Sequence, residues 1–134
     1  MRLAGKSAVI TGGSGNIGMA AAARFLSEGA RVLIVDRDAE RVDAALSDLS
    51  SNAAHGLAAD VTRGDDVARY AAEAQALFGR VDIFFNNAGV AGAVAPLDAY
   101  ADDAFDAVMA VNARGVFLGL KHMLPVMKDG GSIV

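Results

Sequence analysis

A glycine-rich loop is the segment of the chain whose residue types most clearly suggest a binding chemistry. It consists of Thr11-Gly12-Gly13-Ser14-Gly15-Asn16-Ile17-Gly18, follows a short apolar run and leads into a segment with helical spacing. Its glycines match the pattern G-x-G-x-x-G, in which the backbone turns sharply and approaches a pyrophosphate. Free N–H groups and the positive end of the helix then meet the phosphate charge. The alternative is a plain strand-to-helix turn in which small residues only pack, and the loop alone leaves both interpretations open.

An acidic residue stands at the end of the next apolar run. Asp36 follows Val32–Val35, at a position where a carboxylate accepts hydrogen bonds from the ribose hydroxyls of an adenosine nucleotide. The same carboxylate repels a 2′-phosphate, so the sequence favours NAD over NADP, although the adjacent Arg37 weakens that preference. Asp60 has the same placement after the following run. The alternative for both acids is a solvated strand end.

A second loop of polar and small residues, Asn86-Asn87-Ala88-Gly89, follows a later apolar run. The carboxyl ends of parallel strands meet at one edge of a sheet, so we expect this loop beside the glycine-rich loop. Small residues there admit a ligand. Two consecutive asparagines also bond easily to neighbouring backbone, so Asn86 and Asn87 hold strands together, contact the ligand, or do both.

Asn112 is a polar residue on an apolar helical stripe formed by Phe105, Val108, Met109 and Val116. Burying an amide without partners costs about 1–3 kcal/mol in proteins. We therefore expect backbone, water or a ligand to satisfy its donors and its acceptor. Asn112 is a candidate site residue, and the alternative is a core asparagine bonded to a neighbouring turn.

Short apolar runs alternate with amphipathic segments along the chain, and these elements must position the candidate residues. The predicted strands are centred on residues 8–10, 32–35, 55–59, 81–85 and 133–134. Helical spacing occurs over residues 17–25, 38–49, 67–78 and 105–116. Such alternation predicts right-handed βαβ crossovers and an α/β fold with a doubly wound parallel sheet. No repeat or linker divides the chain, so we expect one domain over residues 1–134.

Composition excludes several classes of protein. The 134 residues include no cysteine, so disulfides and thiolate metal sites are excluded, and we expect no metal site. Twelve basic and sixteen acidic residues give a net charge of −4, with the basic residues scattered, which argues against a nucleic-acid partner. No apolar run is long enough to span a membrane, and the first residues lack the apolar stretch of a signal peptide. We expect a cytoplasmic protein.

Together these motifs resemble the classical short-chain dehydrogenase/reductase family over the whole chain, which implies a Rossmann-like sheet. The residues that carry the resemblance to the cofactor site are Gly12, Ser14, Gly15, Asn16, Ile17, Gly18, Asp36, Asp60, Val61, Asn87, Ala88 and Gly89. One departure is Asn16, which stands where the family usually has a glycine. Asparagine tolerates the left-handed conformation better than most residues, so we expect cofactor binding to persist.

The resemblance implies reversible hydride transfer between NAD(H) and a small-molecule alcohol or ketone. It also implies a tyrosine as acid/base, a lysine that lowers the pKa of that tyrosine, a serine that orients the carbonyl and an asparagine in a water relay. Only the asparagine has a match, which is Asn112. Tyr70 and Tyr100 do not fit the family's tyrosine, and Ser132 is expected to begin the fifth strand rather than follow it.

The expected order of motifs stops at about the fifth strand. We therefore expect residues 1–134 to form an NAD-binding domain that is incomplete at its C-terminal end and inactive alone. The alternative is a naturally short, non-catalytic nucleotide-binding or interaction module. A nucleotide-binding methyltransferase is disfavoured by the loop that begins at Asn86. A sheet cut at this strand exposes apolar surface, and together with the resemblance this implies a homo-oligomer, a dimer or tetramer, when full length.

Overall fold

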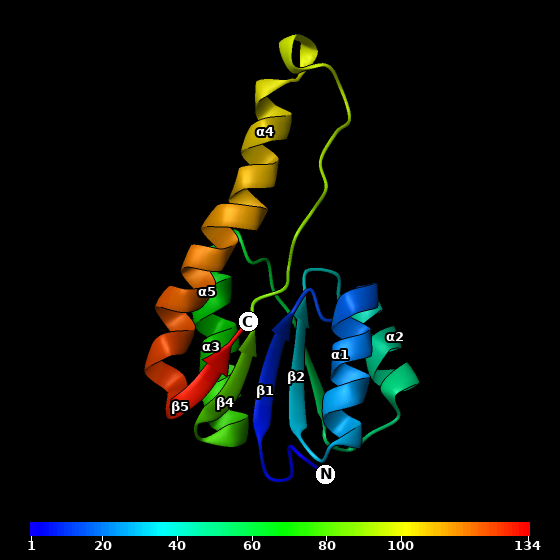
Figure 1. Ribbon diagram of the computed structural model, residues 1–134, viewed down its shortest axis with the longest axis vertical. Coiled ribbons are helices and arrows are strands. Elements are labelled where there is room, and N and C mark those ends of the chain that lie inside the picture. The colour runs from blue at the N-terminus through cyan, green and yellow to red at the C-terminus, as the bar shows by residue number, and fades with distance from the viewer.

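Five parallel strands form the centre of the computed structural model, which describes residues 1–134 (Figure 1). Their order across the sheet is β3-β2-β1-β4-β5. The strands are β1 Ser7–Thr11, β2 Arg31–Asp36, β3 Ala54–Ala58, β4 Val81–Phe85 and β5 Met127–Ile133. The helices are α1 Asn16–Ser27, α2 Ala39–Leu49, α3 Gly64–Phe78, α4 Asp102–Met109 and α5 Gly115–Met123. The predicted α/β doubly wound sheet is confirmed.

Helices cover both faces of this sheet, and the side chains of β1 show how. Ala8 and Ile10 pack with α1 and α2 in one apolar cluster, whereas Val9 packs with α3 and α5 in the other. All three side chains are fully buried. Burying one Val or Ile side chain contributes about 1.5–3 kcal/mol. The continuous apolar runs of the sequence are therefore explained by cover on both sides.

The chain reverses its direction of winding at β1. It first adds β2 and then β3 on one side of β1, and afterwards crosses back to add β4 and β5 on the other side. The chain segments that follow β1 and β4 consequently lead to opposite sides of the sheet from its carboxyl edge. In doubly wound sheets the ligand lies in the crevice at this point.

The helical segment after the loop of β4 differs from the prediction. It comprises α4, a π-helical turn η2 Ala110–Arg114, and α5. Figure 1 shows α4 extending beyond the sheet, with the short 3₁₀ turn η1 Leu97–Ala99 at its far end. The apolar stripe was expected to be buried, but Phe105 is 56% and Met109 is 44% exposed. The reason is that no helix or strand of the sheet covers α4.

The last strand, β5, also differs from the prediction. It begins at Met127, directly after the 3₁₀ turn η3 Leu124–Val126, so Ser132 lies near its end and not at its start. Met127 pairs with Val81 and Ser132 pairs with Ile83, so most of the polar residues between them bulge out of the ladder. Such residues rarely signal a strand. None of the helices combines the length and the apolar composition that a membrane span requires.

Candidate cofactor site

A cavity of about 740 Å³ opens where the loops after β1, β2, β3 and β4 converge. Most of the predicted cofactor residues line it, namely Gly12, Gly15, Asn16, Ile17, Gly18, Asp36, Asp60, Val61, Asn87, Ala88 and Gly89. Ser14 and Asn112 do not line it but bond to residues that do. Sequence reasoning missed several lining residues, among them Arg41, Thr62, Val90, Ala107, Ala110 and Val111. Those on the segment 107–111 could have been found from their place on the helix of Asn112.

Thr11 and Asn87 join the two loops at the centre of the site. The hydroxyl of Thr11 accepts hydrogen bonds from the N–H groups of Asn87 and Ala88, at 3.0 and 3.1 Å. The amide of Asn87 donates to the carbonyl of Thr11 at 2.9 Å. Asn86 donates to the carbonyl of Val116 in α5 at 3.1 Å. Both asparagines therefore hold the structure together, and Asn87 lines the cavity as well.

The glycines of the first loop are required to different degrees. Gly12 has φ +63°, and a Cβ there would lie 3.0 Å from Cα of Ala88. A Cβ on Gly18 would overlap the carbonyl oxygen of Gly12. Gly15 has an extended backbone, and a Cβ there would meet only the carbonyl oxygen of Gly12, at 3.3 Å, so a small shift would accommodate another residue. Asn16 is the first helical residue and has no positive φ, so the left-handed tolerance that we expected it to need is not used.

Asp36 faces this loop from the end of β2. Its Oδ2 accepts hydrogen bonds from Ser14, from the hydroxyl at 2.6 Å and from the N–H at 3.2 Å. Its Oδ1 accepts from the N–H of Arg37 at 2.9 Å. On the other side, the guanidinium of Arg41 donates to the carbonyl of Ser14 at 3.3 Å. Asp38 caps α2 by accepting from the N–H groups of Glu40 and Arg41, and Arg41 lines the cavity.

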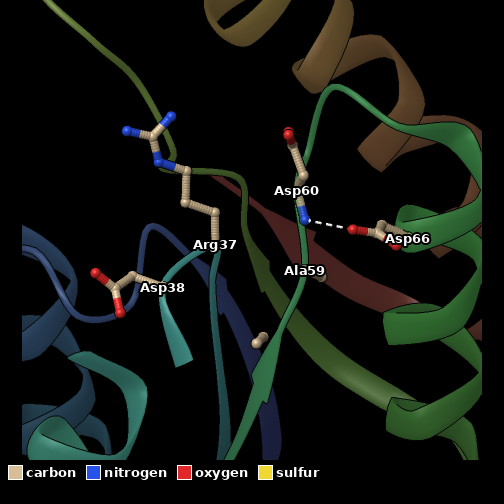
Figure 2. Close-up of a pocket in the computed structure, with 6 residues that line it drawn as sticks. Arg37, Asp38, Ala59, Asp60 and Asp66 are labelled. Carbon is tan, nitrogen blue, oxygen red and sulfur yellow. Dashed lines mark hydrogen bonds between the residues drawn. The ribbon is translucent and has the colours of Figure 1, made fainter. Parts of the chain in front are cut away.

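Asp60 lines both the main cavity and a smaller hollow, which Figure 2 shows with Arg37 and Asp38 on one side and Asp60 on the other. Its carboxylate accepts from the N–H and the hydroxyl of Thr62, at 2.9 and 2.7 Å. Its own N–H donates to Asp66 at 2.8 Å. This hydrogen bond, with help from Arg69 and against the effect of burial, lowers the pKa of Asp66. The loop after β3 is therefore fixed by hydrogen bonds within the loop and to Asp66 in α3.

Asn112 lies in η2 and is exposed, in contrast to the buried amide that we expected. Its partners are backbone groups: it donates to the carbonyl of Val90 and accepts from the N–H of Val90, both at 2.9 Å. A π-turn often marks a functional site within a helix. Here it directs Asn112 toward the loop that lines the cavity.

Neither tyrosine of the chain lies in the cavity. Tyr70 is fully buried between α3 and the sheet, its hydroxyl has no partner, and burial raises its pKa. The hydroxyl of Tyr100 accepts from the N–H of Ala93 at 3.2 Å. Both side chains are thus occupied by packing or by loop contacts.

The cavity suits a dinucleotide. A pyrophosphate needs bare backbone and free N–H groups, and the loop from Gly12 to Gly18 offers both at the start of α1. No acidic residue stands in the first turn of α1, so nothing there repels an anion. Asp36 provides the acceptor that an adenosine ribose needs. The residues present therefore fit the group that the sequence implied.

Comparisons with known proteins agree with this geometry. The family model described as short chain dehydrogenase matches residues 6–134. Levodione reductase of Leifsonia aquatica is 36% identical over 98% of this chain and 51% of its own length. 2-Dehydro-3-deoxy-L-rhamnonate dehydrogenase (NAD(+)) of Sphingomonas sp. (strain SKA58) is 33% identical over 97% of this chain and 51% of its own length. The crystal structure of NAD⁺-bound xylitol dehydrogenase has a TM-score of 0.95 and 33% identity, over 99% of this chain and 53% of that chain.

The chain belongs to the short-chain dehydrogenase family, a class of oxidoreductases. It spans about half the length of the curated relatives it matches.

Proposed function

We propose that the chain forms the cofactor-binding part of an NAD(H)-dependent dehydrogenase that interconverts an alcohol and a ketone. One observation carries the proposal: the glycine-rich loop, Asp36 and the loop from Asn87 to Gly89 all line a single cavity. When bound, the nicotinamide cofactor would supply or accept the hydride. The family membership supports an oxidoreductase that uses a cofactor of this kind.

Each residue has a defined task in this proposal. Gly12, Gly15 and Gly18 admit the pyrophosphate, which also meets the N–H groups at the start of α1. Asp36 accepts from the adenosine ribose, and Asp60 with Val61 borders the adenine. Ala88 and Gly89 leave space for the nicotinamide half. Asn112 holds Val90 at the edge of the cavity and takes part in a water relay for proton transfer.

We propose that the tyrosine, lysine and serine of proton transfer belong to a part of the protein outside residues 1–134. Tyr70 is buried and Tyr100 is bonded to Ala93, so neither can act as the acid/base in the cavity. We therefore propose that the 134 residues alone bind cofactor without turnover. The competing proposal is a naturally short binding module. It predicts that the full-length protein binds NADH but catalyses no hydride transfer.

NAD is the proposed cofactor, with NADP second. Asp36 is a carboxylate at the end of β2, and a carboxylate there repels a 2′-phosphate. Two of the proteins compared have NAD(+) in their names, as the cofactor of a dehydrogenase and as a bound ligand. A cytoplasmic location, where NAD(H) is available, is part of the proposal.

Calorimetric titration of the chain with NADH tests the cofactor assignment. We expect saturable binding at one site per chain. Asp36→Ala should weaken binding at least ten-fold, because the ribose hydroxyls lose their acceptor. Asp43→Ala is the matched control, since Asp43 is exposed on α2 and outside the cavity. A folded chain that gives no heat with NADH, or equal affinity in both variants, contradicts the proposal.

A homo-oligomer is proposed for the full-length protein. Phe105 on α4 is 56% exposed and Phe117 on α5 is 59% exposed. Phe105 belongs to the part of this helical segment that extends beyond the sheet, and α5 continues it beside the sheet (Figure 1). Exposed aromatic side chains on such a segment are typical of an interface. Sedimentation of the full-length protein should show a dimer or tetramer, which Phe105→Ser should weaken. A monomer at all concentrations contradicts this.

A further inference from the structure

Ser14 lies between the carboxylate of Asp36 and the guanidinium of Arg41 at one end of the cavity. Its N–H and hydroxyl both donate to Oδ2 of Asp36, and its carbonyl accepts from Arg41. The same peptide therefore holds a carboxylate with one set of atoms and a guanidinium with another. Asp36 and Arg41 both line the cavity, whereas Ser14 does not.

The carboxylate of Asp36 has little capacity left. A carboxylate offers about four acceptor positions, and Ser14 occupies two on Oδ2 while the N–H of Arg37 occupies one on Oδ1. A ribose hydroxyl can then bond at the free position of Oδ1. The three protein hydrogen bonds fix the direction in which that position points.

The two nearby arginines have no carboxylate partner and can compete for Asp36. Arg37 and Arg41 line the cavity, are exposed, and form no ion pair with any residue of the chain. A guanidinium pairs with a carboxylate through two parallel hydrogen bonds. Without the hydroxyl of Ser14, Oδ2 of Asp36 becomes available for such a pair. Asp36 would then turn away from the ribose, and the guanidinium would offset the negative charge that Asp36 presents to the cavity.

We propose that Ser14 sets the cofactor selectivity of this site, as a positioning residue that holds Asp36 toward the ribose and Arg41 away from the carboxylate. The inference rests on the proposed function. It adds which residue makes the site prefer NADH to NADPH. Because a carboxylate in this orientation accepts from a 2′-hydroxyl and repels a 2′-phosphate, the pair Ser14–Asp36 favours NADH over NADPH. An Asp36 paired with Arg41 would discriminate much less.

Selectivity separates this role from a purely structural one. Loss of loop structure lowers the affinity for NADH and NADPH in parallel, whereas a turned Asp36 changes their ratio. The affinities of the chain for NADH and NADPH are therefore measured by the fluorescence of the bound nicotinamide, for the wild type and for Ser14→Ala. Ser14→Ala keeps the N–H of residue 14 and removes only the hydroxyl. It should lower the ratio of the affinity for NADH to that for NADPH about ten-fold. Ser14→Thr keeps a hydroxyl and should restore the ratio.

Two further variants complete the experiment. Arg41→Gln combined with Ser14→Ala should recover most of the selectivity, because no guanidinium of α2 remains to draw Asp36 away. Ser27→Ala is the matched control, since the hydroxyl of Ser27 bonds only within α1, to the carbonyl of Arg24. Circular dichroism checks that each variant folds, and Ser14→Gly replaces Ser14→Ala if the latter does not.

The outcomes distinguish this inference from the proposed function. A wild type that binds NADH, with a Ser14→Ala variant that keeps its selectivity or loses both affinities equally, overturns the role of Ser14 and leaves the proposed function standing. A wild type that binds NADPH as tightly as NADH also overturns the role of Ser14. A folded wild type that binds neither dinucleotide overturns the proposed function and this inference together.

Discussion

The side chain of Asn112 and the backbone of Val90 form a reciprocal pair of hydrogen bonds, each 2.9 Å long. The amide donates to the carbonyl and accepts from the N–H of the same residue. Val90 lines the cavity, and Asn112 lies in the π-turn between α4 and α5. This pair therefore connects the helical segment that leaves the sheet with the loop that follows β4.

Replacing Asn112 should release that loop. In Asn112→Ala both hydrogen bonds are lost, and we expect the free energy of unfolding to fall by about 1 kcal/mol, since the residue is exposed. Hydrogen exchange at the amide of Val90 should become much faster while amides of β1 keep their protection. Asn52→Ala is the control, because Asn52 is an exposed loop residue. Unchanged protection at Val90 would show that the pair does not hold the loop in solution.

Tyr70 and Tyr100 should respond in opposite ways to the loss of a hydroxyl. Tyr70 is buried with an unpartnered hydroxyl, so Tyr70→Phe removes a desolvated polar group and should raise the free energy of unfolding by up to about 1 kcal/mol. Tyr100→Phe removes the acceptor of the Ala93 N–H and should lower it by about 0.5 kcal/mol. Urea denaturation of both variants measures the difference. A loss of stability in Tyr70→Phe would mean that the hydroxyl has a partner, such as a buried water.

Tyr70 should also make the fold less stable at high pH. Burial raises the pKa of Tyr70 above its ordinary value of 10.0, so the folded state keeps the proton that the unfolded state releases. The ionisation of Tyr70 therefore has no effect on stability below about pH 10 and lowers the stability as the pH rises above that value. The free energy of unfolding between pH 9 and pH 11 should fall more in the wild type than in Tyr70→Phe. Equal slopes would contradict the prediction.

Asp82 should stabilise the fold above pH 4 and stop doing so in acid. Burial alone would raise its pKa, but the N–H of Ser7 at 3.0 Å and the ammonium of Lys6 at 3.1 Å outweigh that effect and lower the pKa below 3.8. The unfolded state thus takes up the proton first as the pH falls. Asp82→Asn should cost about 1 kcal/mol at pH 7, and the cost should shrink toward pH 3. The exposed Asp43 provides the control variant Asp43→Asn, which should show neither effect.

Two glycines of the same loop should differ in their tolerance of a methyl group. A Cβ on Gly13 would lie 2.6 Å from Cβ of Ile34, inside the core, so Gly13→Ala should destabilise by about 1–3 kcal/mol. The nearest atom to a Cβ on Gly15 is the carbonyl oxygen of Gly12 at 3.3 Å, so Gly15→Ala should cost no more than about 1 kcal/mol. Thermal unfolding compares them directly. The reverse order would mean that the loop packs differently from the structure described.

The sequence was sufficient to predict the sheet where burial is two-sided. Val32 to Val35 lies in a strand in both the prediction and the structure, because cover on both faces requires a continuous apolar run. The polar part of β5 was not predictable, since its pairing depends on Met127 and Ser132 meeting β4. The π-turn was missed for a similar reason: Ala110–Arg114 keep ordinary helical spacing, and the partner of Asn112 is distant in the chain.

Within the site, sequence found the residues that face the cavity better than those that support them. Glycines and strand-end acids carry a local pattern, so Gly12, Gly18 and Asp36 could be named in advance. Arg41 carries none, because only the fold places its guanidinium against the carbonyl of Ser14. Thr11 ends a buried strand as a polar residue, and this could have indicated its role in joining the two loops.

Backbone amide chemical shifts on titration with NAD⁺ test whether the cavity is the dinucleotide site, because they report where the dinucleotide binds. We expect saturable shifts in the loops that line the cavity, from Gly12 to Gly18 and around Asp36, Asp60 and Asn87. Amides at the opposite end of the sheet, such as Asp82, should not move. A folded chain whose shifts stay unchanged at millimolar NAD⁺, or change only away from these loops, would contradict this assignment.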